Sequence, residues 1–182
     1  MTSYDGRAFL NAIDKKYDVI MVDAYQDITI PFQMSSVEFF SLVKDHLKED
    51  GIMVVNMNMR GTKEGNINQY LADTIGSVFR AGYVVDVAGT SNRELFVSDN
   101  DRIIENLSTN TEKLSDGELK RMMERVTANL EQYEKGDYIL TDDKAPVELL
   151  GMQVIDELIK GEVAYYKTIY EEQGVKGLLD SL

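Results

Sequence analysis

Two short apolar runs, separated by a helical pattern, dominate the first third of the chain. They extend from Tyr17 to Asp23 and over residues 52–57, and polar residues bound both of them. Short apolar runs of this kind are typical of parallel strands that are buried on both faces. Between them, apolar residues recur at helical spacing over 37–47. The order strand, helix, strand predicts a βαβ unit with parallel strands and a right-handed crossover.

The ends of this helix also have sequence signals. Ser35 or Ser36 stands where a helix cap is expected. Glu38 follows Ser35 at the spacing of a capping box, in which the glutamate bonds back to the cap residue. Asp50 and Gly51 precede the second strand, and glycine is common just beyond a helix end. We therefore expect the helix to extend as far as Asp50 and Gly51.

The pattern beyond the second strand predicts one more helix and two more strands. Apolar positions at helical spacing indicate a helix over 66–79, and apolar runs over 82–87 and 92–98 indicate strands. The short polar turn between these strands predicts a hairpin. The simplest layout is an α/β fold with flanking helices, whose sheet is mostly parallel with one antiparallel strand.

The last third of the chain has a helical pattern. Apolar residues form one broad face over 116–133, and further helical segments are expected over 149–159 and 163–170. We therefore divide the chain into an α/β part, residues 1–108, and a helical extension packed on it, residues 109–182.

Composition narrows the range of partners. The net charge of −13 disfavours nucleic acid and anionic membranes and is compatible with a cationic ligand such as a polyamine. The chain has no cysteine, which excludes disulfides and thiolate chemistry and suits a reducing compartment. No apolar run is long enough to span a bilayer, and no cluster of residues predicts a metal site. We expect a cytoplasmic protein.

Three polar segments are candidate sites. Asp23 directly follows the first strand, where ligands of open α/β sheets bind, and a carboxylate there can hold or deprotonate an amine. Asp5 and Gly6 precede a short helical segment, so the carboxylate can accept a bond from an exocyclic amine while the backbone approaches the ring. Local capping by Asp23 and a simple turn at Asp5 are the structural alternatives. For residues 141–148, a capped helix start with Glu148 favouring the helix dipole is the simpler interpretation.

Three blocks of the chain resemble the second half of spermidine synthases in their order and spacing. They cover residues 5–10, 17–23 and 47–52. Further segments resemble the bacterial spermidine-synthase-like branch, whose members are often fused to membrane domains. These segments are Asp23-Ala24-Tyr25, Ile30-Pro31, Glu38-Phe39-Phe40 and Val54-Val55-Asn56, and residues 141–148 are similar to the closing motif of the branch. By this resemblance the chain is identified as a member of the spermidine/spermine synthase-like family, with part of its Rossmann-like, methyltransferase-type fold.

The resemblance implies a role for each candidate residue. Asp5, with Gly6 beside it, would contact the adenine amino group of an S-adenosylmethionine-type nucleotide. Asp23 would be the general base that deprotonates a polyamine during aminopropyl transfer. The residues expected to bind the substrate are Tyr25, Gln26 and Asp27.

The chain departs from the family pattern in two places. True spermidine synthases have a second aspartate three residues after the first, where this chain has Gln26. Their complete domain also has an earlier βαβ unit with a glycine-rich loop, whereas Gly61 and Gly65 follow the second strand of this chain. We therefore expect the chain to be inactive alone. A methyltransferase-like protein and a non-catalytic, self-associating scaffold are the alternatives, because fold does not determine chemistry.

A chain that starts in the middle of this domain leaves one edge of the strand from Tyr17 to Asp23 without its neighbour. Proteins avoid exposing long apolar strand edges. We expect a homodimer in which this strand pairs with the same strand of a second copy.

Overall fold

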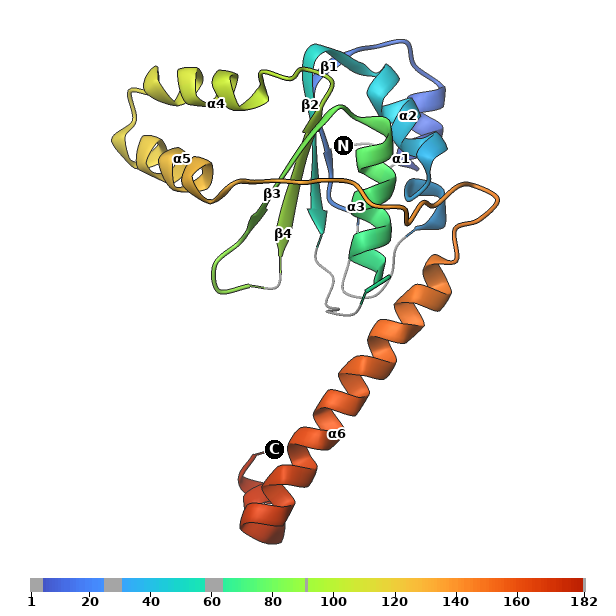
Figure 1. Ribbon diagram of the computed structural model, residues 1–182, viewed down its shortest axis with the longest axis vertical. Helices are drawn as coiled ribbons and strands as arrows, with labels where there is room; N and C mark the ends of the chain where they lie inside the picture. Colours follow the sequence, from blue (N-terminus) through green and yellow to red (C-terminus); the bar gives the residue numbers. More distant parts are fainter. Residues whose placement is uncertain (1–4, 25–30, 58–63, 91, 182) are drawn as a thin grey trace.

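The structure, a computed structural model, describes residues 5–24, 31–57, 64–90 and 92–181. Strands and helices alternate in its first half, and helices dominate the second half (Figure 1). The helices are α1 (Gly6–Asn11), α2 (Val37–Asp45), α3 (Ile67–Val78), α4 (Ile103–Glu112), α5 (Gly117–Asn129) and α6 (Val147–Asp180), with the 3-10 helix η1 (Phe32–Met34). The strands are β1 (Tyr17–Val22), β2 (Leu47–Met57), β3 (Ala81–Asp86), β4 (Arg93–Ser98) and β5 (Glu131–Gln132).

The described strands form one sheet in the order β1-β2-β4-β3-β5. β1 and β2 are parallel, while β4 is antiparallel to both of its neighbours, β2 and β3. β1, β2 and β3 therefore run in one direction, while β4 and the short β5 run in the opposite direction. Two strands are thus antiparallel where one was expected, because β5 adds to the sheet beside β3. The predicted α/β, partial Rossmann-like fold is confirmed, as is the hairpin of β3 and β4. β1 lies at an edge of the sheet, as expected.

One face of the sheet is closed by α1, α2 and α3 (Figure 1). Alternate residues of a strand point to the same face, and on this face they are buried. The core includes Met53, Val55 and Met57 of β2, Leu95 and Val97 of β4, Phe39, Phe40 and Val43 of α2, and Ile67, Leu71 and Ile75 of α3. This packing holds β2 and β4 in place, and both strands carry polar side chains of the candidate site.

The opposite face is covered by α4 and α5, and this packing leaves a cavity of about 690 Å³ (Figure 1). Its lining is mainly apolar and includes Ile52, Val54, Tyr83 and Phe96 from the sheet and Ile103, Leu107, Met123 and Val126 from the two helices. The two faces are therefore packed to different degrees.

The junction of α2 and β2 differs from the expectation. α2 ends at Asp45 and β2 already begins at Leu47, so the helix does not extend to Gly51 as predicted. Residues 48–51 bulge out of the ladder between the first two pairings of β2 with β1. A Cβ at Gly51 would lie 2.9 Å from backbone atoms of Lys48. Glycine is required at this position because of the bulge and not because a helix ends there.

The C-terminal part also differs from the expectation. α5 ends at Asn129, and the next residues form β5, which pairs with β3, so the predicted helix over 116–133 is too long. The segments 149–159 and 163–170 belong to one helix, α6, with Gly174 non-helical inside it. α6 extends away from the sheet (Figure 1). None of the helices in the described part of the chain combines the length and the apolar character needed to cross a bilayer.

Candidate functional site

Three polar side chains lie next to one another at the end of the sheet where β1 and β2 finish and β4 begins. Asp23 directly follows β1, and Asn56 is the penultimate residue of β2. Glu94 on β4 is the register partner of Asn56. The Asn56 Nδ2 donates a hydrogen bond to the Asp23 Oδ1 over 3.1 Å. The structure therefore places Asp23 beyond the carboxyl end of β1, as expected, and adds two neighbours; we name these three residues the Asp23 cluster.

The Asp23 cluster contains more acceptors than donors. Asp23 is exposed, while Asn56 and Glu94 are partly buried. The Asn56 Oδ1 is buried and has no hydrogen-bond partner within the described ranges. Burial and, second, the charge of Asp23 raise the pKa of Glu94. Arg93, the neighbour of Glu94 in sequence, is bound to Asp86 by two hydrogen bonds of 2.5 Å and 3.0 Å.

This arrangement suits a cationic amine. A protonated primary amine has three N–H donors and no acceptor, and the Asp23 cluster offers oxygens from three side chains. Charge-assisted hydrogen bonds of this kind are roughly twice as strong as neutral ones. Asp23 is the exposed member and is therefore placed to take a proton from an incoming amine.

The segment that follows Asp23 contains the predicted substrate-binding residues Tyr25, Gln26 and Asp27. All three lie outside the described residues. Their roles stay predictions.

Asp5 and Gly6 lie at the start of α1. The Asp5 Oδ1 accepts a hydrogen bond from the Ala8 N–H over 2.9 Å, so Asp5 caps the helix. This bond and, after it, a bond from the Gln33 side chain lower the pKa of Asp5. Asp5 is exposed, and a carboxylate has about four acceptor positions, so the cap leaves room for a ligand donor. The predicted short helix is confirmed and ends at Asn11.

Gly6 borders an apolar groove of about 280 Å³ between α1, α2 and the edge of β1. A Cβ at Gly6 would make only an ordinary contact, 3.5 Å from the Cε of Met34, so the protein's own packing does not require glycine there. An apolar groove beside an exposed carboxylate fits adenine, because the groove contacts the ring and the carboxylate accepts a bond from the amino group. The described residues therefore fit the adenine part of a nucleotide.

The segment 141–148 lies against α1 and α2 as well as starting α6. The Asp142 carboxylate accepts two hydrogen bonds from Arg7, from Nη1 over 2.8 Å and from Nη2 over 2.5 Å. The Ser36 hydroxyl donates to the same carboxylate over 2.5 Å. α6 itself begins at Val147 without a side-chain cap, so the expected cap is wrong, but the helix start is confirmed and Glu148 lies in its first turn as expected.

Glu38 belongs to this contact and not to a capping box. Ser36, not Ser35, caps α2, where its hydroxyl accepts a bond from Phe39 N–H. The Glu38 Oε2 accepts a hydrogen bond from the Asp142 N–H over 3.0 Å. The predicted capping box is therefore wrong, because a distant segment takes the glutamate that the local motif would use.

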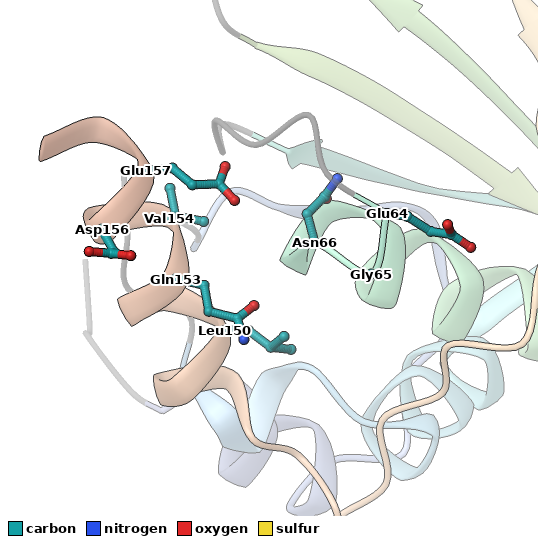
Figure 2. A pocket seen from close by; sticks show the side chains of 8 residues that line it. All are labelled: Glu64, Gly65, Asn66, Leu150, Gln153, Val154, Asp156 and Glu157. Carbon is teal, nitrogen blue, oxygen red and sulfur yellow. The ribbon is translucent and has the colours of Figure 1, made fainter. Parts of the chain in front are cut away.

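A further pocket, of about 300 Å³, lies between the start of α3 and α6 (Figure 2). Gly65 lines it with a φ of 71°, and its N–H donates to the Gln69 side chain over 2.8 Å. Gly65 therefore shapes the start of α3 and is not part of a phosphate-binding loop. Asp156, on the α6 side, is paired with Lys160 over 2.5 Å. The pocket is a junction between two helices, and we assign no ligand to it.

Sequence reasoning did not select Asn56, Glu94 or Arg7 as site residues. Asn56 is the polar residue near the end of an otherwise apolar strand, which is the available signal for it. Glu94 joins the site through the register of β2 and β4, and Arg7 through a partner 135 residues away. Neither relation has a local sequence signal.

Comparison with known proteins agrees with the resemblance seen in the sequence. Residues 1–88 match the spermine/spermidine synthase domain. A probable polyamine aminopropyl transferase of Bifidobacterium longum (strain NCC 2705) is 47% identical over 196 residues, which cover 98% of this chain and 44% of that protein. The chain thus spans less than half the length of this curated relative.

Two solved structures are more distantly similar. Human methyltransferase-like protein 13 in complex with SAH is 21% identical with a TM-score of 0.48, over 77% of this chain and 63% of that one. A probable spermidine synthase from Corynebacterium glutamicum ATCC 13032 is 18% identical with a TM-score of 0.44, over 75% and 54%. The domain match over residues 1–88 and the 47% identity support the assignment of the chain to the spermidine/spermine synthase-like family.

Proposed function

We propose that this chain carries the amine-binding end and the adenine contacts of an aminopropyl transfer site. The Asp23 cluster supports this most directly, because the buried Asn56 Oδ1 has no partner among the residues that the structure describes. An acceptor left in this state costs about 1–3 kcal/mol, which a ligand N–H donor recovers. The family to which the chain is assigned agrees with a polyamine as that ligand.

The proposed reaction joins an acceptor amine to the propylamine group of a decarboxylated S-adenosylmethionine-type nucleotide. The amine nitrogen attacks the methylene carbon bound to the sulfonium sulfur. A C–N bond forms, the C–S bond breaks with its electron pair on sulfur, and methylthioadenosine leaves. The Asp23 carboxylate takes the proton that the amine loses, while Asn56 and Glu94 accept its other N–H bonds and fix the direction of attack.

At the other end of the site, Asp5 accepts a hydrogen bond from the adenine amino group and Gly6 lets the ring enter the groove. Tyr25, Gln26 and Asp27 complete the acceptor site in this proposal. We expect turnover by this chain alone to be weak, because the described contacts reach only the adenine and the amine.

We place the protein in the cytoplasm.

The test is a calorimetric titration of the chain with putrescine, a diamine. Asp23→Asn is expected to weaken binding about 10- to 100-fold, since it removes a charge-assisted bond of about 1.5–3 kcal/mol. Asp18→Asn is the matched control, because Asp18 lies on β1, the strand that Asp23 follows, is exposed and pairs with Lys48 over 2.8 Å. The proposal is lost if the unmodified chain does not bind the diamine, or if both variants bind it equally.

The same titration with nucleotides distinguishes the aminopropyltransferase hypothesis from the methyltransferase hypothesis. Aminopropyl transfer requires the decarboxylated nucleotide, whose propylamine group has no carboxylate. Tighter binding of S-adenosylmethionine itself would favour the methyltransferase alternative.

We also propose that two copies pair along the edge of β1, from Tyr17 to Asp23. This edge is apolar, with Val19 53% and Met21 69% exposed. Paired strands would cover these side chains and close the adenine groove on its β1 side. The expected mass in solution is twice 20.6 kDa, and Met21→Lys should return it to the monomer value. Met152→Lys, at an equally exposed methionine on α6, should leave the dimer intact; a monomeric unmodified chain would contradict the pairing.

A further inference from the structure

The loop over residues 133–146, which we name the closing loop, runs from β5 past α3 to α6 (Figure 1). Asp73 of α3 is 1% exposed and accepts hydrogen bonds from the N–H groups of Gly136, over 2.8 Å, and Tyr138, over 3.1 Å. The Tyr133 hydroxyl also donates to Asp73. The middle of the closing loop is therefore bound to a buried carboxylate.

The far end of the closing loop is bound to α2. Leu140 is fully buried, its N–H donates to the Thr74 hydroxyl over 2.9 Å, and its carbonyl accepts from Val37 N–H over 2.9 Å. The next turn is closed by two backbone bonds between Thr141 and Lys144. These contacts leave Asp142 with a defined position beside the first turns of α1 and α2.

Asp142 connects three segments that are far apart in the sequence. Its carboxylate binds Arg7 of α1 in a bidentate pair and accepts from Ser36, the fully buried cap of α2. The Arg7 guanidinium also donates to the Gln33 carbonyl over 3.1 Å. The hydrogen bonds from Arg7 and Ser36 lower the pKa of Asp142, so the carboxylate is charged at neutral pH.

Arg7 lies two residues after Asp5, within the first turn of α1. α1 has only six residues, and short helices have little stability of their own. The orientation of its first turn must therefore come from tertiary contacts, and the contact through Arg7 is bidentate and directional. Whatever holds Arg7 also holds the Asp5 carboxylate.

We propose that Asp142 is a positioning residue, which through Arg7 fixes the first turn of α1 and so holds Asp5 in place for the nucleotide. The proposal rests on the proposed function for the role of Asp5, but the mechanical link between Asp142 and α1 is independent of it. Because the Asp142 side chain is 40% exposed, we expect effects of about two- to fivefold and not the loss of the fold.

The first test is amide hydrogen exchange of the full chain without ligand. Asp142→Asn should speed exchange of the Ala8 N–H, which the Asp5 carboxylate protects, by about two- to fivefold, and leave α3 unchanged. Asp143→Asn, at the exposed next residue, is the control and should leave Ala8 as it is. Arg7→Gln should speed the same exchange, and the effect of the double variant should be smaller than the sum of the two, because both substitutions break the Arg7–Asp142 pair. Unchanged exchange at Ala8, or additive effects, would overturn the proposal.

The second test separates positioning from general destabilisation. Asp142→Asn should weaken methylthioadenosine binding about two- to fivefold and leave putrescine binding unchanged, because the Asp23 cluster does not depend on α1. Equal losses for both ligands would show a general structural role and overturn the positioning claim. If the unmodified chain binds no nucleotide, the proposed function fails at its adenine end, and the Ala8 exchange alone decides whether Asp142 holds α1.

Discussion

The Asp5 end and the Asp23 end of the candidate site are built in opposite ways. At the Asp5 end, the carboxylate caps α1, and a web of bonds through Arg7, Gln33 and Asp142 holds that helix. At the Asp23 end, the described residues give the carboxylate one hydrogen bond of 3.1 Å, from Asn56. At the Asp5 end, the polar groups bind one another. At the Asp23 end, the buried Asn56 Oδ1 has no hydrogen-bond partner among the described residues.

In the proposed function, this difference matches the part of the substrate that each end would bind. A flat, neutral adenine gains from a rigid contact, since a pre-positioned acceptor adds affinity without the cost of ordering it. A charged amine binds more tightly to acceptors that have no donor in the protein. Such acceptors cost free energy while the site is empty, and the amine N–H groups satisfy them on binding. The comparison therefore predicts that changes at the Asp5 end act through position, and changes at the Asp23 end act through charge.

We expect the largest loss of stability from a substitution of Asp73, which binds the closing loop and so supports the Asp5 end from a distance. Asp73→Ala removes a buried carboxylate and leaves the N–H groups of Gly136 and Tyr138 without their acceptor. We expect the free energy of unfolding to fall by about 3 kcal/mol and Tm by roughly 10 °C, measured by urea and thermal denaturation. Asp73→Ala should also speed exchange of the Ala8 N–H.

Asp137→Ala is the control for this substitution, because Asp137 lies on the same loop and is exposed. It should change neither stability nor exchange. If Asp73→Ala destabilised the protein without affecting Ala8, the closing loop would be a structural element unconnected to α1, and the contrast between the two ends would lose its support.

A smaller effect, a change in the pKa of Glu94, is expected at the Asp23 end. Burial is the first cause of the raised pKa of Glu94 and the charge of Asp23 the second. Asp23→Asn should therefore lower the pKa of Glu94 but leave it above the ordinary value of 4.5, as measured by NMR titration of its carboxyl carbon. Asp18→Asn is again the control. A pKa of Glu94 that does not move would mean that the two carboxylates do not share a site.

Much of the fold near Asp23 was predictable, because its signals are local. The apolar runs before Asp23 and Asn56 predict two strands, and the single helix between them makes the strands parallel. The position of Asp23 at a strand end then follows from the pattern alone. The position of Asp23 was therefore predictable from local signals, whereas Glu94 joins it only through the register of β2 and β4.

The Asp5 end was predictable only in part, because its support is long-range. Arg7 and Asp142 are 135 residues apart, and no local pattern shows that they meet. Glu38 illustrates the competition: a capping box was expected from spacing, but the tertiary contact with Asp142 N–H takes the side chain. β5 was missed for a similar reason, since a two-residue strand forms only where β3 offers a partner.

The most direct test of the account is a calorimetric titration with methylthioadenosine, comparing the unmodified chain with Asp5→Ser. Serine keeps the helix cap, which holds α1, but removes the second carboxylate oxygen and the charge that the account assigns to the adenine amino group. We predict measurable binding by the unmodified chain and an affinity about 10- to 100-fold lower in the variant. Equal affinities, or no binding by a folded unmodified chain, would contradict the claim that Asp5 is the adenine contact of an aminopropyl transfer site.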